Sequence, residues 1–189
     1  TSSCSFTVTV VNTNPPKINC PAHVNVNVNP VNCGATNVTY NIPYVTSACN
    51  SMYTTSRITG LASGVNYPLG NTLNTYTVID DQGRKDTCSF TVTVKDNMAP
   101  TLICLSNVVY LDEGQCTKIV DYSLPSASDR CSAVTLTRTS GQASGSVFSQ
   151  GDHAITYKAV DLAGNSSSCT FYVVVVDDQP PTITCPPNI

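Results

Sequence analysis

The ten cysteines are the residues of this chain whose spacing most clearly indicates chemistry. They recur at steps of 81 to 84 residues, as Cys4, Cys88 and Cys169 illustrate. Cysteines in such a framework form disulfides in an oxidising compartment, whereas a zinc site needs closely paired ligands such as Cys-x2-Cys. The closest two cysteines, Cys104 and Cys116, are 12 residues apart. The pattern therefore predicts disulfides in an extracellular or cell-surface protein.

The cysteines belong to a longer internal repeat. The segment Cys-Ser-Phe-Thr-Val-Thr-Val at residues 4–10 recurs unchanged at 88–94, and a close variant occupies 169–175. Self-similarity at a fixed period is typical of tandem arrays. The predicted division is a last strand of a preceding repeat at 1–11, repeat 1 at 12–96, repeat 2 at 97–177, and the start of a following repeat at 178–189.

Composition limits the possible function. The net charge is −3 and charged residues make up 11 % of the chain, which excludes the basic surface of a nucleic-acid-binding protein. No apolar run approaches the roughly 20 residues of a membrane-spanning helix, so we expect no membrane insertion. Each repeat is too small to bury a large core, and disulfides are the usual compensation.

Alternating apolar and polar residues predict strands throughout, and no stretch of ten residues has helical periodicity. The predicted strands are residues 23–29, 35–42, 53–61, 71–79 and 88–95 in repeat 1, and 107–111, 117–124, 134–139, 153–160 and 169–176 in repeat 2. Short strands separated by Pro, Gly and Asn indicate an all-β sandwich. Because the links between repeats contain proline, we expect them to be semi-rigid and the array to form a rod.

The order of the motifs is similar to that of a known family. Each repeat carries Ile-x-Cys or Ile-Cys, then two cysteines, Ser-Gly-x-x-aromatic and Tyr-x-x-x-Asp-x-x-Gly, and closes with Cys-x-Phe, as in residues 169–171. The chain resembles the hyalin repeat (HYR) family of immunoglobulin-like extracellular modules. Leu105 and Ser149 replace prolines of the family pattern, and Ser47 stands where the aspartate before Cys49 is expected. The resemblance implies tandem, disulfide-stapled immunoglobulin-like β-sandwiches with an adhesive or structural role and no catalytic residues.

The resemblance also implies a disulfide pairing. It favours joining the first and fourth cysteine of each repeat and then the second and third: Cys20–Cys88, Cys33–Cys49, Cys104–Cys169 and Cys116–Cys131. Geometry disfavours the second type of pair, because an intervening strand would separate the two cysteines by roughly 30 Å unless it bends near a proline.

A second pairing scheme therefore stays open. In it Cys49 bonds Cys88, and Cys33 reaches Cys104 in the next repeat. We favour the first scheme. In both schemes Cys4 and Cys185, and in the second scheme also Cys20, need partners outside this chain segment.

Acidic and amide side chains form the second candidate site. Asp96 and Asn97 lie in the link, Asp129 precedes Cys131, and Asp161 and Asn165 flank the last hairpin turn. These loops meet at one pole of an immunoglobulin-like sandwich, and Ca²⁺ takes six to eight oxygen ligands. We expect either Ca²⁺ at the joints between domains or ordinary turn chemistry, which also uses Asp and Asn. No cofactor is otherwise required.

Other candidates have weaker support. His23 and His153 could act as bases for a serine, but both are better explained as strand residues. Tyr44, Tyr53, Tyr67 and Tyr110 could line a sugar-binding face, although tyrosine is common in half-buried strands. The sequons at Asn37 and Asn165 are candidates for N-glycosylation.

These observations lead to two candidate functions. The first is a non-enzymatic fibre, stalk or matrix built by end-to-end stacking of these domains, with neighbouring copies or repeats as partners. The alternative is a cell-adhesion or ligand-binding module on a stalk, for a surface glycan or a protein receptor.

Overall fold

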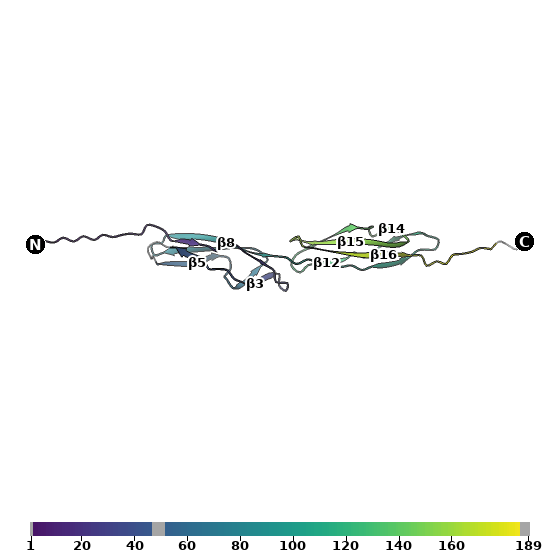
Figure 1. The fold of residues 1–189 in the computed structure, drawn as a ribbon, viewed down its shortest axis with the longest axis horizontal. Coiled ribbons are helices and arrows are strands. Elements are labelled where there is room, and N and C mark those ends of the chain that lie inside the picture. Colours follow the sequence, from purple (N-terminus) through teal and green to yellow (C-terminus); the bar gives the residue numbers. More distant parts are fainter. Residues whose placement is uncertain (1, 47–51, 186–189) are drawn as a thin grey trace. The chain divides into compact units, whose positions relative to one another are not determined.

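The chain folds into two compact units, Thr1–Asp96 and Asn97–Ile189 (Figure 1). The computed structural model describes residues 2–46 and 52–185, and all regular secondary structure in them is β-strand. Unit 1 ends at Asp96, the residue at which the sequence predicts the end of repeat 1. The immunoglobulin-like all-β architecture expected from the alternating pattern is confirmed for each unit.

Unit 1 is built around a four-stranded sheet in the order β2-β8-β7-β5. Two short pairs, β1-β4 and β3-β6, accompany it. Its strands are β1 (Lys17–Asn19), β2 (Val24–Asn27), β3 (Gly34–Val38), β4 (Tyr44–Thr46), β5 (Tyr53–Thr59), β6 (Val65–Pro68), β7 (Gly70–Asp80) and β8 (Lys85–Lys95). The early strand β2 pairs in parallel with the last strand, β8, so the beginning and the end of the unit meet in one sheet.

Unit 2 repeats this topology. Its four-stranded sheet has the order β10-β16-β15-β13, with the pairs β11-β14 and β12-β9 beside it. The strands are β9 (Thr101–Ile103), β10 (Asn107–Tyr110), β11 (Thr117–Val120), β12 (Ser126–Ser128), β13 (Val134–Ser140), β14 (Ser146–Ser149), β15 (Gly151–Asp161) and β16 (Ser166–Val176). Again the early strand β10 runs parallel to the last strand, β16.

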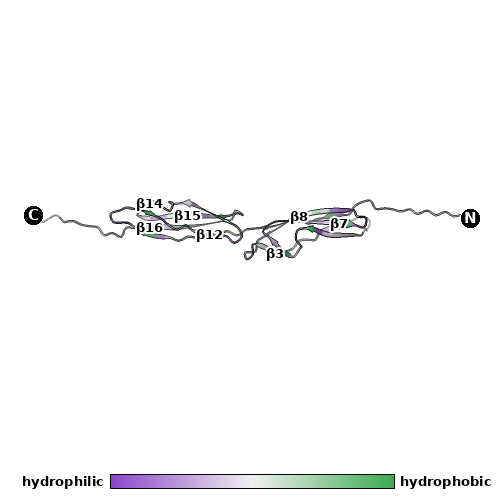
Figure 2. Ribbon diagram, turned by 180° about the vertical axis from the view of Figure 1, so that it is seen from behind, coloured by the Kyte–Doolittle hydropathy of each residue, from purple (hydrophilic) through white to green (hydrophobic). Residues whose placement is uncertain are grey.

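The core of each unit is formed by one face of its strands. Along β16 the side chains of Phe171, Val173 and Val175 are buried, while Thr170 and Tyr172 between them are exposed. This is the period of two that a strand imposes on its side chains. Figure 2 shows hydrophobic and hydrophilic residues interspersed along the strands of both units. The alternating sequence pattern therefore separates a core face from a solvent face.

One glycine in each unit occupies a position that no other residue could adopt without strain. Gly60 and Gly141 follow the edge strands β5 and β13 with φ of 87° and 85°. A Cβ on Gly141 would lie 2.4 Å from the carbonyl oxygen of Ala154, and one on Gly60 would lie 2.1 Å from Oδ1 of Asn74. Both the positive φ and the close approach require glycine.

The prediction that residues 1–11 form the last strand of a preceding repeat stays a prediction. In this chain residues 2–13 contain no strand, and Phe6 is 87 % exposed. A strand needs a neighbouring strand for its hydrogen bonds, and these residues pair with none. Six short strands of the described residues, β1, β4, β6, β9, β12 and β14, were missing from the prediction. Each has only three or four residues, which gives little alternation to detect.

Candidate functional site

A disulfide joins the first and last parts of each unit. Cys20, just after β1, bonds Cys88 in β8, with their Cα atoms 5.6 Å apart. Cys104, just after β9, bonds Cys169 in β16 at a Cα separation of 6.2 Å. Both separations lie in the usual range for a disulfide. These are the first and fourth cysteines of each repeat, so the structure contains both of these expected bonds, and they exclude the scheme that used Cys88 and Cys104 elsewhere.

The expected Cys116–Cys131 bond is wrong. Cys116 is a free, exposed thiol, whereas Cys131 is disulfide-bonded. Strands β11 and β12 lie between these two cysteines and pair with different strands, β14 and β9. The chain between Cys116 and Cys131 therefore runs through two separate strand pairs, which does not bring the two sulfur atoms together as a disulfide requires.

The remaining cysteines fall into two groups. Cys33 is disulfide-bonded, but Cys49 lies outside the described residues, so the Cys33–Cys49 pairing stays a prediction. Cys4 and Cys185 are free and exposed in this chain. Their pairing with cysteines outside the segment also stays a prediction.

A buried carboxylate organises the last hairpin turn of each unit. In unit 2, Asp161 ends β15; its Oδ1 accepts a hydrogen bond from the Asn165 main-chain N (2.7 Å), and its Oδ2 accepts one from Asn165 Nδ2 (2.8 Å). In unit 1, Asp80 ends β7 and accepts from the main-chain N of Arg84 (2.8 Å) and from its Nε (2.7 Å). Asp161 and Asn165 therefore complete a turn, and calcium binding by these two residues stays a prediction.

The hydrogen bonds shift the titration of both carboxyls. Burial by itself would raise the pKa of Asp161, but the hydrogen bonds from Asn165, Gly164 and Ala163 outweigh it and lower the pKa below its ordinary value. The pKa of Asp80 is likewise lowered, because the bonds from Arg84 and Gln82 outweigh the effect of burial. Both carboxyls are therefore ionised at neutral pH, and the charged form is the one that the turn stabilises.

We expect unit 2 to lose stability in acid through Asp161. A carboxyl with a lowered pKa in the folded state contributes stability that is present above the unfolded value of about 3.9 and is lost as pH falls through the folded pKa. Thermal melts should therefore change little between pH 7 and about pH 4 and decline below that. Asp161→Asn should flatten the decline, whereas Asp178→Asn, at an exposed position, should leave it unchanged. An equally steep decline in Asp161→Asn would contradict the assignment.

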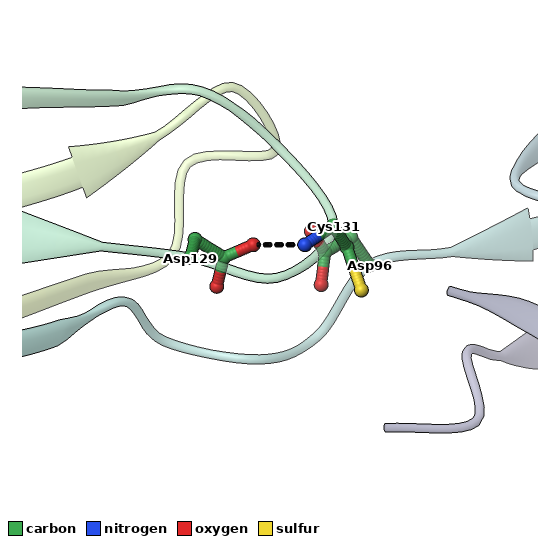
Figure 3. Close-up of side chains that lie close together, drawn as sticks. All are labelled: Asp96, Asp129 and Cys131. Carbon is green, nitrogen blue, oxygen red and sulfur yellow. Dashed lines mark hydrogen bonds between the residues drawn. The ribbon is translucent and has the colours of Figure 1, made fainter. Parts of the chain in front are cut away.

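Asp129, another predicted calcium ligand, follows β12 directly. Asp129 Oδ1 accepts hydrogen bonds from the main-chain N of Cys131 (2.7 Å) and of Ser132 (2.9 Å), the first of which Figure 3 shows. Asp129 therefore also stabilises a turn through main-chain hydrogen bonds. Asp96 is the last residue of unit 1 and Asn97 the first of unit 2. Calcium binding by these residues stays a prediction, which melting curves with Ca²⁺ and with EDTA would test.

The ring of each histidine lies within hydrogen-bonding distance of a main-chain atom. His23 Nδ1 accepts a hydrogen bond from the Thr91 main-chain N at 2.9 Å, joining the start of β2 to β8. His153 Nε2 lies 2.8 Å from the carbonyl oxygen of Ser149. These contacts fit the interpretation of both residues as strand residues rather than as bases.

The four candidate tyrosines do not share an environment. Tyr44, Tyr53 and Tyr110 are 65 %, 48 % and 54 % exposed, but Tyr67 is 1 % exposed and cannot line a binding face. Its hydroxyl donates to the Leu61 carbonyl at 2.7 Å. Burial and the neighbouring Tyr40 raise the pKa of Tyr67 to about 12. Its sequence position, three residues before Gly70, gave no sign of this burial.

The two sequons also differ. Asn37 is exposed and has φ of 52°, within the register shift between Ala35 and Val38 of β3. The Asn165 side chain instead donates its amide to Asp161. Glycosylation of either stays a prediction.

Repeated β-sandwiches, each closed by a disulfide between the residue that follows its first strand and its last strand, define an extracellular tandem-module protein. The HYR domain model matches residues 11–94 and 95–175, and the chain belongs to this family. Among the described residues no helix is long and apolar enough to span a membrane. The resemblance of the sequence to HYR repeats is thus confirmed, as is an extracellular or cell-surface location.

The relatives agree with this assignment. The chain is 36 % identical to Hyalin of Strongylocentrotus purpuratus over 97 % of its length, covering 16 % of that protein. It is 31 % identical to Hyalin of Lytechinus variegatus over 97 % of its length, covering 36 % of that protein. The chain therefore spans a minor part of these relatives. Protocadherin Gamma B2 extracellular cadherin domains 3-6 matches with a TM-score of 0.43 at 14 % identity, covering 89 % of this chain and 53 % of that one.

Proposed function

We propose that this chain is part of an extracellular fibre, stalk or matrix formed by end-to-end stacking of disulfide-bonded domains. One observation carries the proposal: in both units a disulfide ties the segment that enters the fold to the last strand. A load applied through the two ends of a unit passes through these two segments. The disulfide lies across that path, so most of the unit is shielded from mechanical unfolding.

A second function has narrower support. Exposed tyrosines at Tyr44, Tyr53 and Tyr110 would suit an adhesive surface for a glycan or a protein receptor. Aromatic side chains with a polar tip are common at such interfaces. Adhesion and fibre formation are compatible, because an adhesive face can be displayed on a stalk. Belonging to the HYR family supports a non-enzymatic role in either case.

Single-molecule stretching tests the mechanical part of the proposal. With the disulfides intact, unit 1 should release only the residues outside the loop between Cys20 and Cys88, which are 68 positions apart. A reductant should add about 230 Å of extension, at roughly 3.4 Å per residue. The double variant Cys20→Ala/Cys88→Ala should show the longer extension without reductant. Full extension of the oxidised wild-type chain would overturn the proposal.

Electron microscopy of native material tests the assembly itself. A regular filament whose axial repeat matches one or two domains would support end-to-end stacking. Discrete particles that bind glycan with measurable affinity would instead favour the adhesive function.

A further inference from the structure

The outer face of the four-stranded sheet in unit 2 is apolar at one end. Val108 and Tyr110 of β10 are each 54 % exposed, and Tyr172 of β16 is 48 % exposed. Val108 lies opposite Val174, and Tyr172 lies opposite Ala154 of β15. These side chains alternate with the buried core residues, so they share the solvent face of the sheet. Contiguous apolar patches of this kind mark interaction sites.

Unit 1 has the same topology but carries polar residues at the four positions that correspond to Val108, Tyr110, Tyr172 and Val174, although Leu73 on the same face is 56 % exposed. By strand register, Val108 and Tyr110 correspond to Asn25 and Asn27. Tyr172 and Val174 correspond to Thr91 and Thr93. The fold does not require apolar residues at these positions, because unit 1 forms the same sheet without them. The patch in unit 2 is thus available for a role outside its own fold.

The charges of the unit 2 face are arranged for self-association. Among the outward-facing residues of its four strands, the charged ones are Asp152 and Lys158, both exposed on β15. They have opposite signs and lie six positions apart, or about 20 Å along the strand. If two copies of the face pack with their strands antiparallel, a two-fold axis brings Asp152 of each copy over Lys158 of the other.

We propose that this outer face of unit 2 associates with the same face of a second copy of the chain. Near the axis, the Tyr172 ring of one copy packs on Thr156 and Thr170 of the other, whose hydroxyls lie 2.9 Å apart and satisfy each other. Aligned sheets pack about 10 Å apart in this way. The contact is lateral and does not depend on end-to-end stacking.

The size of the face sets the strength of the contact. Four strands about 4.8 Å apart and up to about 36 Å long present roughly 600 Å². A stable complex buries about 800 Å² on each partner. We therefore expect a weak, micromolar dimer rather than an obligate one. Repetition along a longer array would multiply such contacts.

Sedimentation equilibrium of the whole chain tests the proposal with a charge-reversal cycle. The chain would carry serine at the free cysteines Cys4, Cys116 and Cys185, so that no covalent dimer contributes. We expect Asp152→Lys and Lys158→Asp each to weaken dimerisation at least fivefold. The double variant Asp152→Lys/Lys158→Asp should restore it, because each new lysine again faces an aspartate.

A substitution taken from unit 1 provides the second arm. Tyr172→Thr introduces the residue that unit 1 carries and should also weaken the dimer at least fivefold, because Tyr172 lies near the two-fold axis. Asn71→Lys, at the position in unit 1 that corresponds to Asp152, should leave it unchanged. Thermal melts would show that each variant is folded. A wild-type chain that stays monomeric up to about 1 mM, or a double variant without restored association, would overturn the proposal.

Discussion

Replacing Cys104 and Cys169 with alanine is expected to lower the free energy of unfolding of unit 2 by about 4 kcal/mol. The bond joins positions 65 residues apart, and a disulfide restricts the unfolded chain more as the closed loop lengthens. This loss is a large part of the stability of a domain of this size, for which 5–15 kcal/mol is typical. The corresponding loss in unit 1, where Cys20 and Cys88 are 68 apart, should be similar.

Urea denaturation followed by tyrosine fluorescence or circular dichroism measures this loss. The double variant Cys104→Ala/Cys169→Ala should shift the midpoint of the unit 2 transition and leave the unit 1 transition in place. Cys116→Ala provides the matched control, because this thiol is free and exposed. If the double variant were as stable as the control, the Cys104–Cys169 bond would not be a structural staple.

The second large effect is expected from Phe171→Ala in the core of unit 2. Phe171 is 2 % exposed, stacks on Tyr157 at a centroid distance of 6.3 Å and meets the edge of Tyr122 at 5.2 Å. Removing a buried phenylalanine ring costs about 3–5 kcal/mol, because the cavity is only partly refilled. In a unit of this size, the melting temperature should fall by at least about 12 °C.

Unit 1 contains a matched position for this test. Phe90 is 1 % exposed and lies between Tyr40 and Tyr76, at centroid distances of 4.8 and 6.3 Å. Phe90→Ala should therefore destabilise unit 1 by a similar amount. Ser168→Ala, on the solvent face of β16, should change stability by less than about 0.5 kcal/mol. A small effect of both phenylalanine variants would mean that the aromatic triads do not hold the two cores together.

The long strands were predictable because their side chains carry the signal themselves. β8 alternates apolar and polar residues over many positions, as a strand buried on one face demands, and β16 contains the apolar run Tyr172–Val176, which has the length of a strand. The short strands β1 and β9 carry three residues each and form because a partner strand lies beside them. Their existence depends on contacts between residues far apart in the chain, which local alternation does not record.

For the candidate site residues as well, the sequence predicted the role of some and the fold decided the environment of others. Asp161 and Asn165 could be recognised as turn residues, since Asp and Asn favour turns wherever they occur. That Asp161 is buried and bonded through both oxygens depends on the end of β15 and could not be deduced from spacing. Likewise, Tyr67 and Tyr110 look alike in sequence, yet one lies in a core and the other on a surface.

The sequence by itself determined that this chain is an array of disulfide-stapled β-domains, because the period of the cysteines and the alternation of apolar residues are properties of the sequence alone. Tertiary structure decided which cysteines meet. Cys116 and Cys131 are close in sequence, but an extended chain of two strands separates them, whereas Cys104 and Cys169 are brought together because β9 packs beside β16. A disulfide forms where strands place two sulfur atoms in contact, and that placement depends on the whole sandwich.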